Sequence, residues 1–176
     1  MAQENRPRVA ISSCLIGEPV RYDGGHKRHA CITGLLSKHF DWFPVCPEVA
    51  IGMGVPRPPI QLVERHGRVH ALGVDNPALD VTAELQDCAQ QLVEQLAGVS
   101  GYIFKSRSPS CGLTDTDLFN TDHRVSGKTS GIFAARIHVL LPDLPMVDEM
   151  RLDDPAIRDA FIQQVKRYHL AGQGGT

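Results

Sequence analysis

The sequence contains no apolar run long enough to cross a membrane. Every hydrophobic stretch is far shorter than the roughly 20 residues that span a bilayer. The opening residues, MAQENRPR, carry charges with no apolar stretch behind them, which is not the pattern of a secretory signal. We therefore expect a cytoplasmic protein that has no membrane partner.

An excess of positive charge is also missing. The 18 Lys and Arg residues are outnumbered by 20 Asp and Glu residues, and the net charge is -2 with His neutral. This balance disfavours a broad electrostatic hold on nucleic acid, although it leaves room for a local basic patch. With 176 residues, 42% of them hydrophobic, the chain is long enough to bury one core. We predict a single domain over residues 1–176, with its core at about 8–168 and a frayed glycine-rich end at 172–176.

Cysteines at a Cys-x-x-Cys spacing, the strongest sequence signal for a metal site, are absent. The total number of cysteines is odd, and thiols in the cytoplasm are kept reduced, so we do not expect a disulfide framework. Reduced thiols bind metals, act as nucleophiles or fill a core. The cysteines are Cys14, Cys31, Cys46, Cys88 and Cys111.

What the sequence does contain is an alternation of short apolar strands and amphipathic helices. The predicted strands are residues 8–12, 42–45, 102–104 and 145–147, and Pro44 makes the second irregular or places it near an edge. The predicted helices are residues 29–40, 80–96, 130–141 and 155–168, and residues 60–63 and 68–72 form a hairpin. This order predicts an α/β fold in a single domain. The expected architecture is a Rossmann-like open sheet, mostly parallel, with helices on both faces and a small hairpin insertion.

Three of the cysteines follow predicted strands. Cys14 comes after the first strand, Cys46 directly after the second, and Cys111 lies in the loop after the third. Because the carboxyl ends of parallel strands share one edge of the sheet, these side chains are expected to converge there. Cys88 lies on the apolar face of the helix at 80–96, and Cys31 stands among apolar residues at the start of another helix. We interpret both of these as core residues.

The spacing alone does not decide what the three converging cysteines do. Small buried cysteines at strand ends are common core residues. Three thiolates with one open position also suit a catalytic zinc ion or an iron–sulfur cluster. The prolines, glycines and serines beside Cys46 and Cys111 favour a metal site, because they fix the loop and supply hydrogen bonds to sulfur.

The motifs around these cysteines resemble those of a known family. They are SCLIG at 13–17 with PVRYDGG at 19–25, VCPEV at 45–49 with GVPRPP at 54–59, and SPSCG at 108–112 after Lys105. Together they resemble the domain of unknown function 523 family, whose characterised members are thiouracil desulfurases, also called desulfidases. The resemblance extends over residues 8–168.

The resemblance implies a cofactor and a reaction. The cofactor is a 4Fe–4S cluster held by Cys14, Cys46 and Cys111, with one iron left open. The reaction is the non-redox removal of sulfur from a thiopyrimidine, with release of hydrogen sulfide. Glu48 and a serine of the 108–112 motif resemble the catalytic pair of the family. Ser108 is favoured over the alternative, Ser110, because Ser110 is adjacent to a cluster ligand.

Other residues near the motifs are candidates for substrate binding. Tyr22 suits stacking on a base, while Arg21 and Asp23 suit hydrogen bonds to its edge, although Asp23-Gly24 is equally typical of a turn. Lys105 belongs to the same set. Arg57 either contacts substrate or braces the loop after Cys46.

Several functions stay open at this point. The expected substrate is a small thiopyrimidine of the 2-thiouracil or 4-thiouracil type, and the alternative is 4-thiouridine or thiolated transfer RNA. A zinc hydrolase or deaminase with Glu48 as base, or a cluster-binding module without catalysis, would use the same residues. The oligomeric state is not predicted.

Overall fold

The computed structural model describes residues 5–174. The strands predicted at 8–12 and 102–104 lie at the centre of a parallel sheet, sheet A. In sheet order its strands are β2 (Asp41–Val45), β1 (Arg8–Ser12), β5 (Tyr102–Phe104) and β8 (Met146–Asp148). All neighbouring pairs are parallel. The central strands are apolar on both faces, as buried parallel strands must be. The strand that contains Pro44 is an edge strand, which confirms the prediction.

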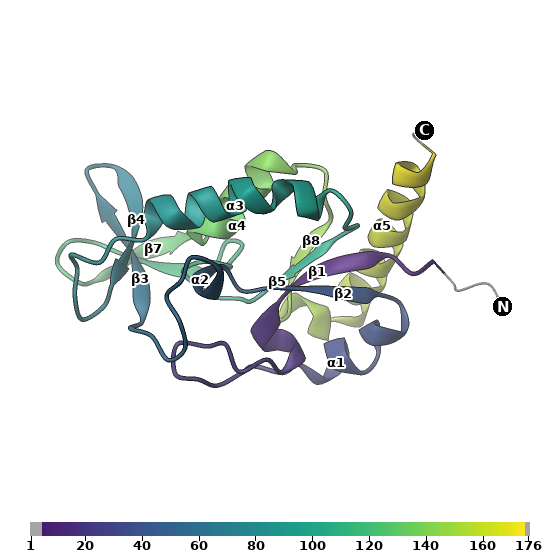
Figure 1. Ribbon diagram of the computed structural model, residues 1–176, viewed down its shortest axis with the longest axis horizontal. Coiled ribbons are helices and arrows are strands. Elements are labelled where there is room, and N and C mark those ends of the chain that lie inside the picture. The colour runs from purple at the N-terminus through teal and green to yellow at the C-terminus, as the bar shows by residue number, and fades with distance from the viewer. Residues whose placement is uncertain (1–4, 175–176) are drawn as a thin grey trace.

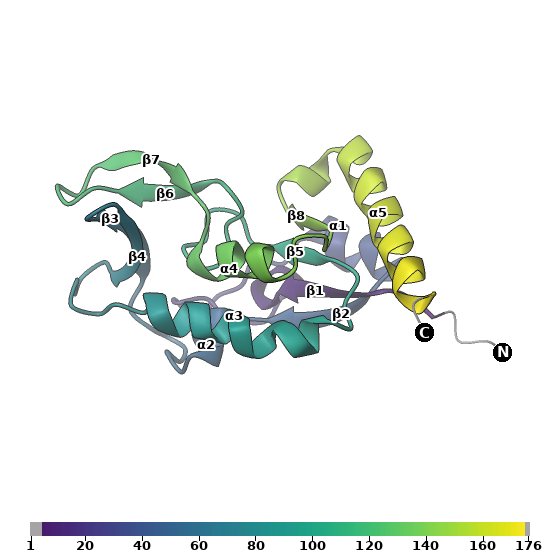
Figure 2. The same ribbon diagram turned by 90° about the horizontal axis from the view of Figure 1, so that it is seen from above.

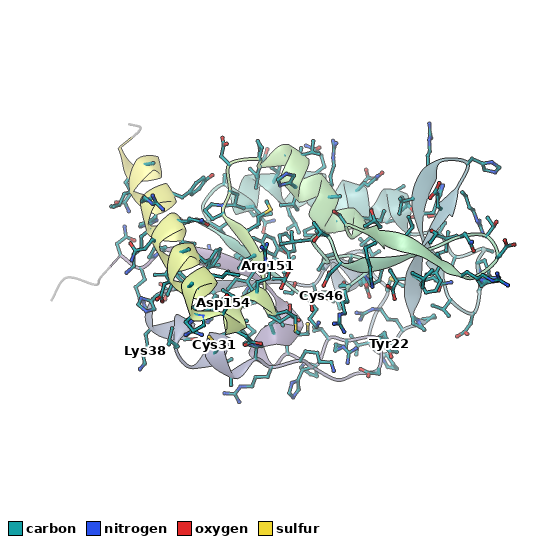
Figure 3. The ribbon with its side chains drawn as sticks, turned by 180° about the vertical axis from the view of Figure 1, so that it is seen from behind. Tyr22, Cys31, Lys38, Cys46, Arg151 and Asp154 are labelled. Carbon is teal, nitrogen blue, oxygen red and sulfur yellow. The ribbon has the colours of Figure 1, made fainter. Side chains whose placement is uncertain are left out.

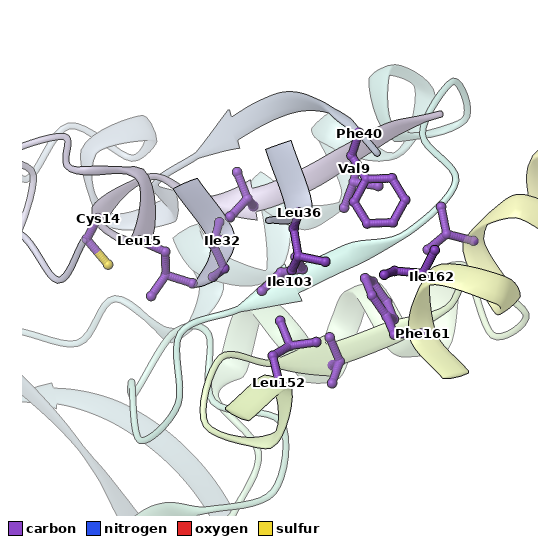
Figure 4. Close-up of a cluster of buried hydrophobic side chains, with 13 residues drawn as sticks. Val9, Cys14, Leu15, Ile32, Leu36, Phe40, Ile103, Leu152, Phe161 and Ile162 are labelled. Atoms are coloured by element: carbon purple, nitrogen blue, oxygen red, sulfur yellow. The ribbon is translucent and has the colours of Figure 1, made fainter. Parts of the chain in front are cut away.

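Helices cover both faces of sheet A (Figure 1). The α-helices are α1 (Ala30–Thr33), α2 (Pro47–Ala50), α3 (Thr82–Leu96), α4 (Ile132–Leu140) and α5 (Pro155–Gln173). The 3-10 helices are η1 (Ser13–Ile16), η2 (Leu36–Lys38) and η3 (Arg151–Asp153). One core cluster packs α3 and α4 against Ala10 and Tyr102, and the other packs α1 and α5 against Val9 and Ile103 (Figure 4). The predicted α/β class, with a mostly parallel sheet and helices on both faces, is confirmed.

A second four-stranded sheet, sheet B, lies beside sheet A at one end of the molecule (Figure 2). Its strands, in sheet order, are β4 (Arg68–Gly73), β3 (Ile60–Arg65), β6 (Thr116–Phe119) and β7 (Val125–Thr129). The hairpin of β3 and β4 was predicted. The hairpin of β6 and β7 was not, because β7 is a polar, exposed strand without the apolar alternation that marks one. The insertion is therefore larger than predicted.

The single helix predicted for residues 29–40 is wrong. The chain leaves helical geometry at Gly34, and only η2 follows before β2. The Ser37 hydroxyl donates to the Ile32 carbonyl (3.0 Å) and accepts from the Trp42 indole N–H (2.9 Å). These side-chain hydrogen bonds take the place of the i to i−4 backbone hydrogen bonds of a helix. The spacing of the apolar residues could not reveal this change.

The last helix is longer than predicted, because α5 includes Gly172 and Gln173. The predicted fraying of residues 172–176 stays a prediction. Residues 1–4 and 175–176 lie outside the described part of the chain. Within residues 5–174, no helix has the length and apolar character needed to span a bilayer.

Candidate active site

The order of the strands creates a site at the carboxyl end of sheet A. The chain extends the sheet from β1 to β2 on one side and from β5 to β8 on the other, so the order reverses between β1 and β5. Ligands bind at such reversals in α/β sheets. A cavity of about 430 Å³ lies there. Its lining includes the predicted residues Cys14, Cys46, Cys111, Glu48, Ser108, Ser110, Arg21, Tyr22, Arg57 and Lys105.

Asp23 is the predicted site residue that does not line this cavity. Its carboxylate accepts a hydrogen bond from the Gly25 backbone N–H at 2.9 Å, an arrangement that stabilises the turn. Tyr22 lies at the rim with 42% of its surface exposed, and the Arg21 guanidinium is 5.5 Å from its ring centroid. The turn interpretation of Asp23 is therefore the one that the contacts support.

The three cysteines reach the cavity from different elements. Cys14 lies in η1 after β1, Cys46 is the N-cap of α2 after β2, and Cys111 closes the loop after β5. Cys31 lies well to the side of Cys46 (Figure 3), where the Arg158 guanidinium of α5 is 3.8 Å from its sulfur. Cys88 is buried in α3, as predicted for a core residue.

Burial controls the acidity of these thiols. It raises the pKa of Cys14 to about 11, against the opposing effect of the Lys105 charge. Burial likewise raises the pKa of Cys46, and it raises that of Cys111 well above the usual value. The observation that brings these three side chains together is that all of them line the same cavity. Such thiols keep their protons unless a bound cation replaces them.

The donor set tests which metal group could bind. A single zinc ion holds each thiolate at about 2.3 Å, so its ligands crowd around one point. Cys14, Cys46 and Cys111 line one cavity, and thiolates of this kind are donors for an iron–sulfur cluster as well as for zinc. The donor chemistry therefore fits a cluster at this site.

Glu48 lies in the first turn of α2, where two side chains fix its carboxylate. The Arg57 Nε donates to one oxygen at 2.7 Å, and the Ser110 hydroxyl donates to the other at 2.8 Å. Only 4% of the Arg57 side chain is exposed, and its second nitrogen donates to the Gly54 carbonyl at 3.0 Å. Arg57 therefore braces Glu48 and the loop after Cys46.

The two serines of the 108–112 loop have different tasks. The Ser108 hydroxyl oxygen accepts hydrogen bonds from the backbone N–H groups of Ser110 (3.2 Å) and Cys111 (3.0 Å). This leaves its own O–H available, and Ser108 is half-buried at the cavity wall. Ser110 is buried and directs its O–H to Glu48.

The start of α4 holds this loop in place. The backbone N–H of Ile132 donates to the Pro109 carbonyl, and that of Ala134 donates to the Ser110 carbonyl, both at 3.0 Å. Gly131 precedes them in close contact with the loop: a Cβ there would lie 2.5 Å from the Ser110 carbonyl carbon. The loop geometry therefore depends on a glycine about twenty residues away in the sequence.

Sequence reasoning missed Glu149. This residue directly follows β8, is 4% exposed and accepts hydrogen bonds from Lys105 and Ser106. Its position after the last predicted strand was the available signal, because that strand end shares the edge with the others. Arg107, which also lines the cavity, was missed as well.

Comparisons with known proteins agree with this geometry. The model of the 2-thiouracil desulfurase family matches residues 9–149, which is most of the chain. An uncharacterized protein of Bacillus subtilis (strain 168), YbbK, is 31% identical over 113 residues, or 59% of this chain and 72% of the relative. The solved structure of the [4Fe-4S]-dependent thiouracil desulfidase TudS is similar, with a TM-score of 0.61 and 30% identity. That match covers 88% of this chain and 97% of the other. The chain therefore belongs to the 2-thiouracil desulfurase family of enzymes, as its three cysteine motifs predicted.

Proposed function

We propose that this protein removes sulfur from a small thiopyrimidine of the 2-thiouracil or 4-thiouracil type. Water replaces the sulfur, so the products are the oxo-pyrimidine and hydrogen sulfide, and no electrons are gained or lost. The observation that carries this proposal is that the thiols of Cys14, Cys46 and Cys111 line one cavity together with a braced carboxylate. The likeness to a [4Fe-4S]-dependent thiouracil desulfidase supports it. The proposed place of action is the cytoplasm, where thiols are kept reduced and available to a cluster.

Cys14, Cys46 and Cys111 would hold a 4Fe–4S cluster and leave one iron open. Such a cluster would supply Lewis-acid chemistry suited to the soft sulfur of a C=S group. The protein residues then have to supply water, protons and orientation.

Glu48 is the general base in this proposal. Its carboxylate takes a proton from the water that attacks the C=S carbon and returns a proton to the departing sulfur. Arg57 and Ser110 orient both carboxylate oxygens, so the base is fixed before the substrate arrives. A general acid–base group of this kind accelerates a reaction by about 10²- to 10⁴-fold.

The remaining cavity residues bind the pyrimidine. Ser108 donates its O–H to the ring or to the attacking water. Tyr22 stacks on the ring at the rim, and Arg21 donates to its edge. Lys105 contributes a positive charge. Asp23 stabilises the turn that carries Tyr22 and does not contact the substrate.

A second candidate substrate is 4-thiouridine or a thiolated transfer RNA. The observation that favours it is the charge at the cavity: Lys27 and Arg107 are both exposed there, and Glu48 is the one carboxylate among the described lining residues. Cations at the mouth suit a phosphate-bearing substrate.

The decisive experiment is anaerobic reconstitution followed by a sulfide-release assay on 2-thiouracil, 4-thiouracil, thiouridine and thiolated RNA. Turnover of the free bases supports the first candidate, and turnover confined to the nucleoside or RNA supports the second. A reconstituted brown protein that binds thiopyrimidines but releases no sulfide would contradict both. A colourless protein that is active with bound zinc would support the zinc hydrolase alternative instead.

A further inference from the structure

An ion pair joins Lys105, which lines the cysteine cavity, to the buried carboxylate of Glu149. Glu149 accepts a hydrogen bond from the Lys105 ammonium at 2.7 Å. It also accepts from the backbone N–H and the hydroxyl of Ser106, each at 2.7 Å. Two side chains and one backbone group thus converge on a carboxylate that is 4% exposed.

The Lys105 ammonium has no hydrogen-bond donor left for substrate. Its three N–H groups are matched by three acceptors: Glu149, the Ser106 carbonyl (2.9 Å) and the Ser106 hydroxyl (3.1 Å). Lys105 nevertheless lines the cavity, and 21% of its side chain is exposed. It therefore presents a fixed charge to the cavity rather than a donor.

We infer that Glu149 is a positioning residue that holds the Lys105 ammonium as a fixed positive charge beside the cysteine cavity. By binding Ser106 twice, it also anchors the start of the loop that carries Ser108 and Cys111. This inference rests on the cluster site of the proposed function. Glu149 holds the ammonium of Lys105, and Ser12 holds its backbone: the Ser12 hydroxyl accepts a hydrogen bond from the Lys105 backbone N–H at 2.9 Å.

Electrostatics supports this role. Lys105 and the three cysteines line the same cavity, so the charge of Lys105 acts on the group that those cysteines would hold. Burial alone would raise the pKa of Glu149, but hydrogen bonds from Lys105 and Ser106 outweigh burial and lower it. A carboxylate and an ammonium held in this way are both charged, and their combined effect on a nearby cluster depends on both charges.

The test measures the midpoint potential of the reconstituted cluster in four variants. Glu149→Gln leaves Lys105 without its counter-charge, so the potential is expected to shift to a more positive value. Lys105→Met removes the positive charge, so the potential is expected to shift to a more negative value. In the double variant the midpoint potential is expected to return close to the wild-type value. In Lys105→Arg, which keeps the positive charge, it is expected to stay close to the wild-type value.

A matched control is the exposed Lys128–Asp117 pair on sheet B. Lys128→Met and Asp117→Asn change the charge in the same way, but solvent screens them, so the potential is expected to stay constant. Equal shifts of the same sign in Glu149→Gln and Lys105→Met, or no shift in either, would overturn the inference. A wild-type protein that takes up no cluster would overturn the proposed function instead.

Discussion

Glu48 and Ser110 are joined by a 2.8 Å hydrogen bond although 62 residues separate them in the sequence. The bond connects the start of α2 with the loop after β5, so two of the cysteine motifs meet through it. Its consequence is that the two serines of the 108–112 loop are not equivalent. One positions the proposed base, and the other faces the cavity.

Substitution of the serines should separate these tasks. Ser110→Ala frees one oxygen of Glu48 and is expected to lower kcat about tenfold, the effect of losing one good hydrogen bond. Ser108→Ala removes the acceptor of two backbone N–H groups as well as the donor in the cavity. It is expected to lower kcat further and to reduce the free energy of unfolding by about 1 kcal/mol. Sulfide release and thermal unfolding measure the two effects. Equal activity of both alanine variants with unchanged unfolding would contradict the division.

Replacement of the Glu48 carboxylate should stop chemistry without removing the cluster. Glu48→Gln keeps the shape of the side chain but cannot accept a proton, so kcat is expected to fall by about 10²- to 10⁴-fold. The visible absorption of the reconstituted cluster should stay the same, because Glu48 is not a ligand. Loss of both turnover and absorption would show that its role is structural.

The iron bound by cysteine variants should separate the proposed cluster ligands from the core cysteine. Replacing Cys14, Cys46 or Cys111 by Ser is expected to lower the iron and sulfide bound after reconstitution. The matched control is Cys88→Ser, which changes a buried cysteine of α3 and should leave the iron content unchanged at some cost in stability. Iron loss in the Cys88 variant at a temperature where it is folded would contradict the assignment.

Gly131 offers a test of the loop that does not touch the cavity itself. A Cβ at Gly131 would lie 2.5 Å from the Ser110 carbonyl carbon and 2.8 Å from the Cys111 nitrogen. Gly131→Ala is therefore expected to displace Cys111 and to reduce both cluster uptake and thermal stability. Gly127→Ala in β7 is the control, because a Cβ there meets nothing within 4 Å. Cluster uptake by the Gly131 variant equal to that of the control would contradict the packing argument.

Stability of the cluster-free protein should depend on pH through Glu149. Hydrogen bonds from Lys105 and Ser106 outweigh burial and hold the pKa of Glu149 below its ordinary value of 4.5. The folded state therefore binds this proton less readily than the unfolded chain does. The stabilisation is fully present above pH 4.5 and is lost as the pH falls through 4.5 toward the folded-state pKa.

Thermal unfolding of wild type and Glu149→Gln between neutral and acidic pH measures this dependence. The wild type should lose more stability on acidification than the variant, because the amide does not titrate. Parallel curves for the two proteins would show that Glu149 contributes nothing to the pH dependence.

The sequence by itself determined the class of fold and the meeting place of the cysteines. Apolar segments at strand length, separated by helices, predict parallel strands, and parallel strands bring their carboxyl ends to one edge. Cys14, Cys46 and Cys111 follow such strands, so their convergence on one cavity was predictable. The motifs around them identified the family, which the comparisons confirmed.

Only the tertiary structure decided which side chains touch. The bonds of Glu48 to Ser110 and of Glu149 to Lys105 join segments that are 62 and 44 residues apart, and their geometry depends on strand register and loop path. The break at Gly34 and the polar strand β7 were also invisible in the sequence. The physical reason is the same in each case. Apolar periodicity records what a segment buries, whereas a polar contact depends on a partner that the fold brings from elsewhere.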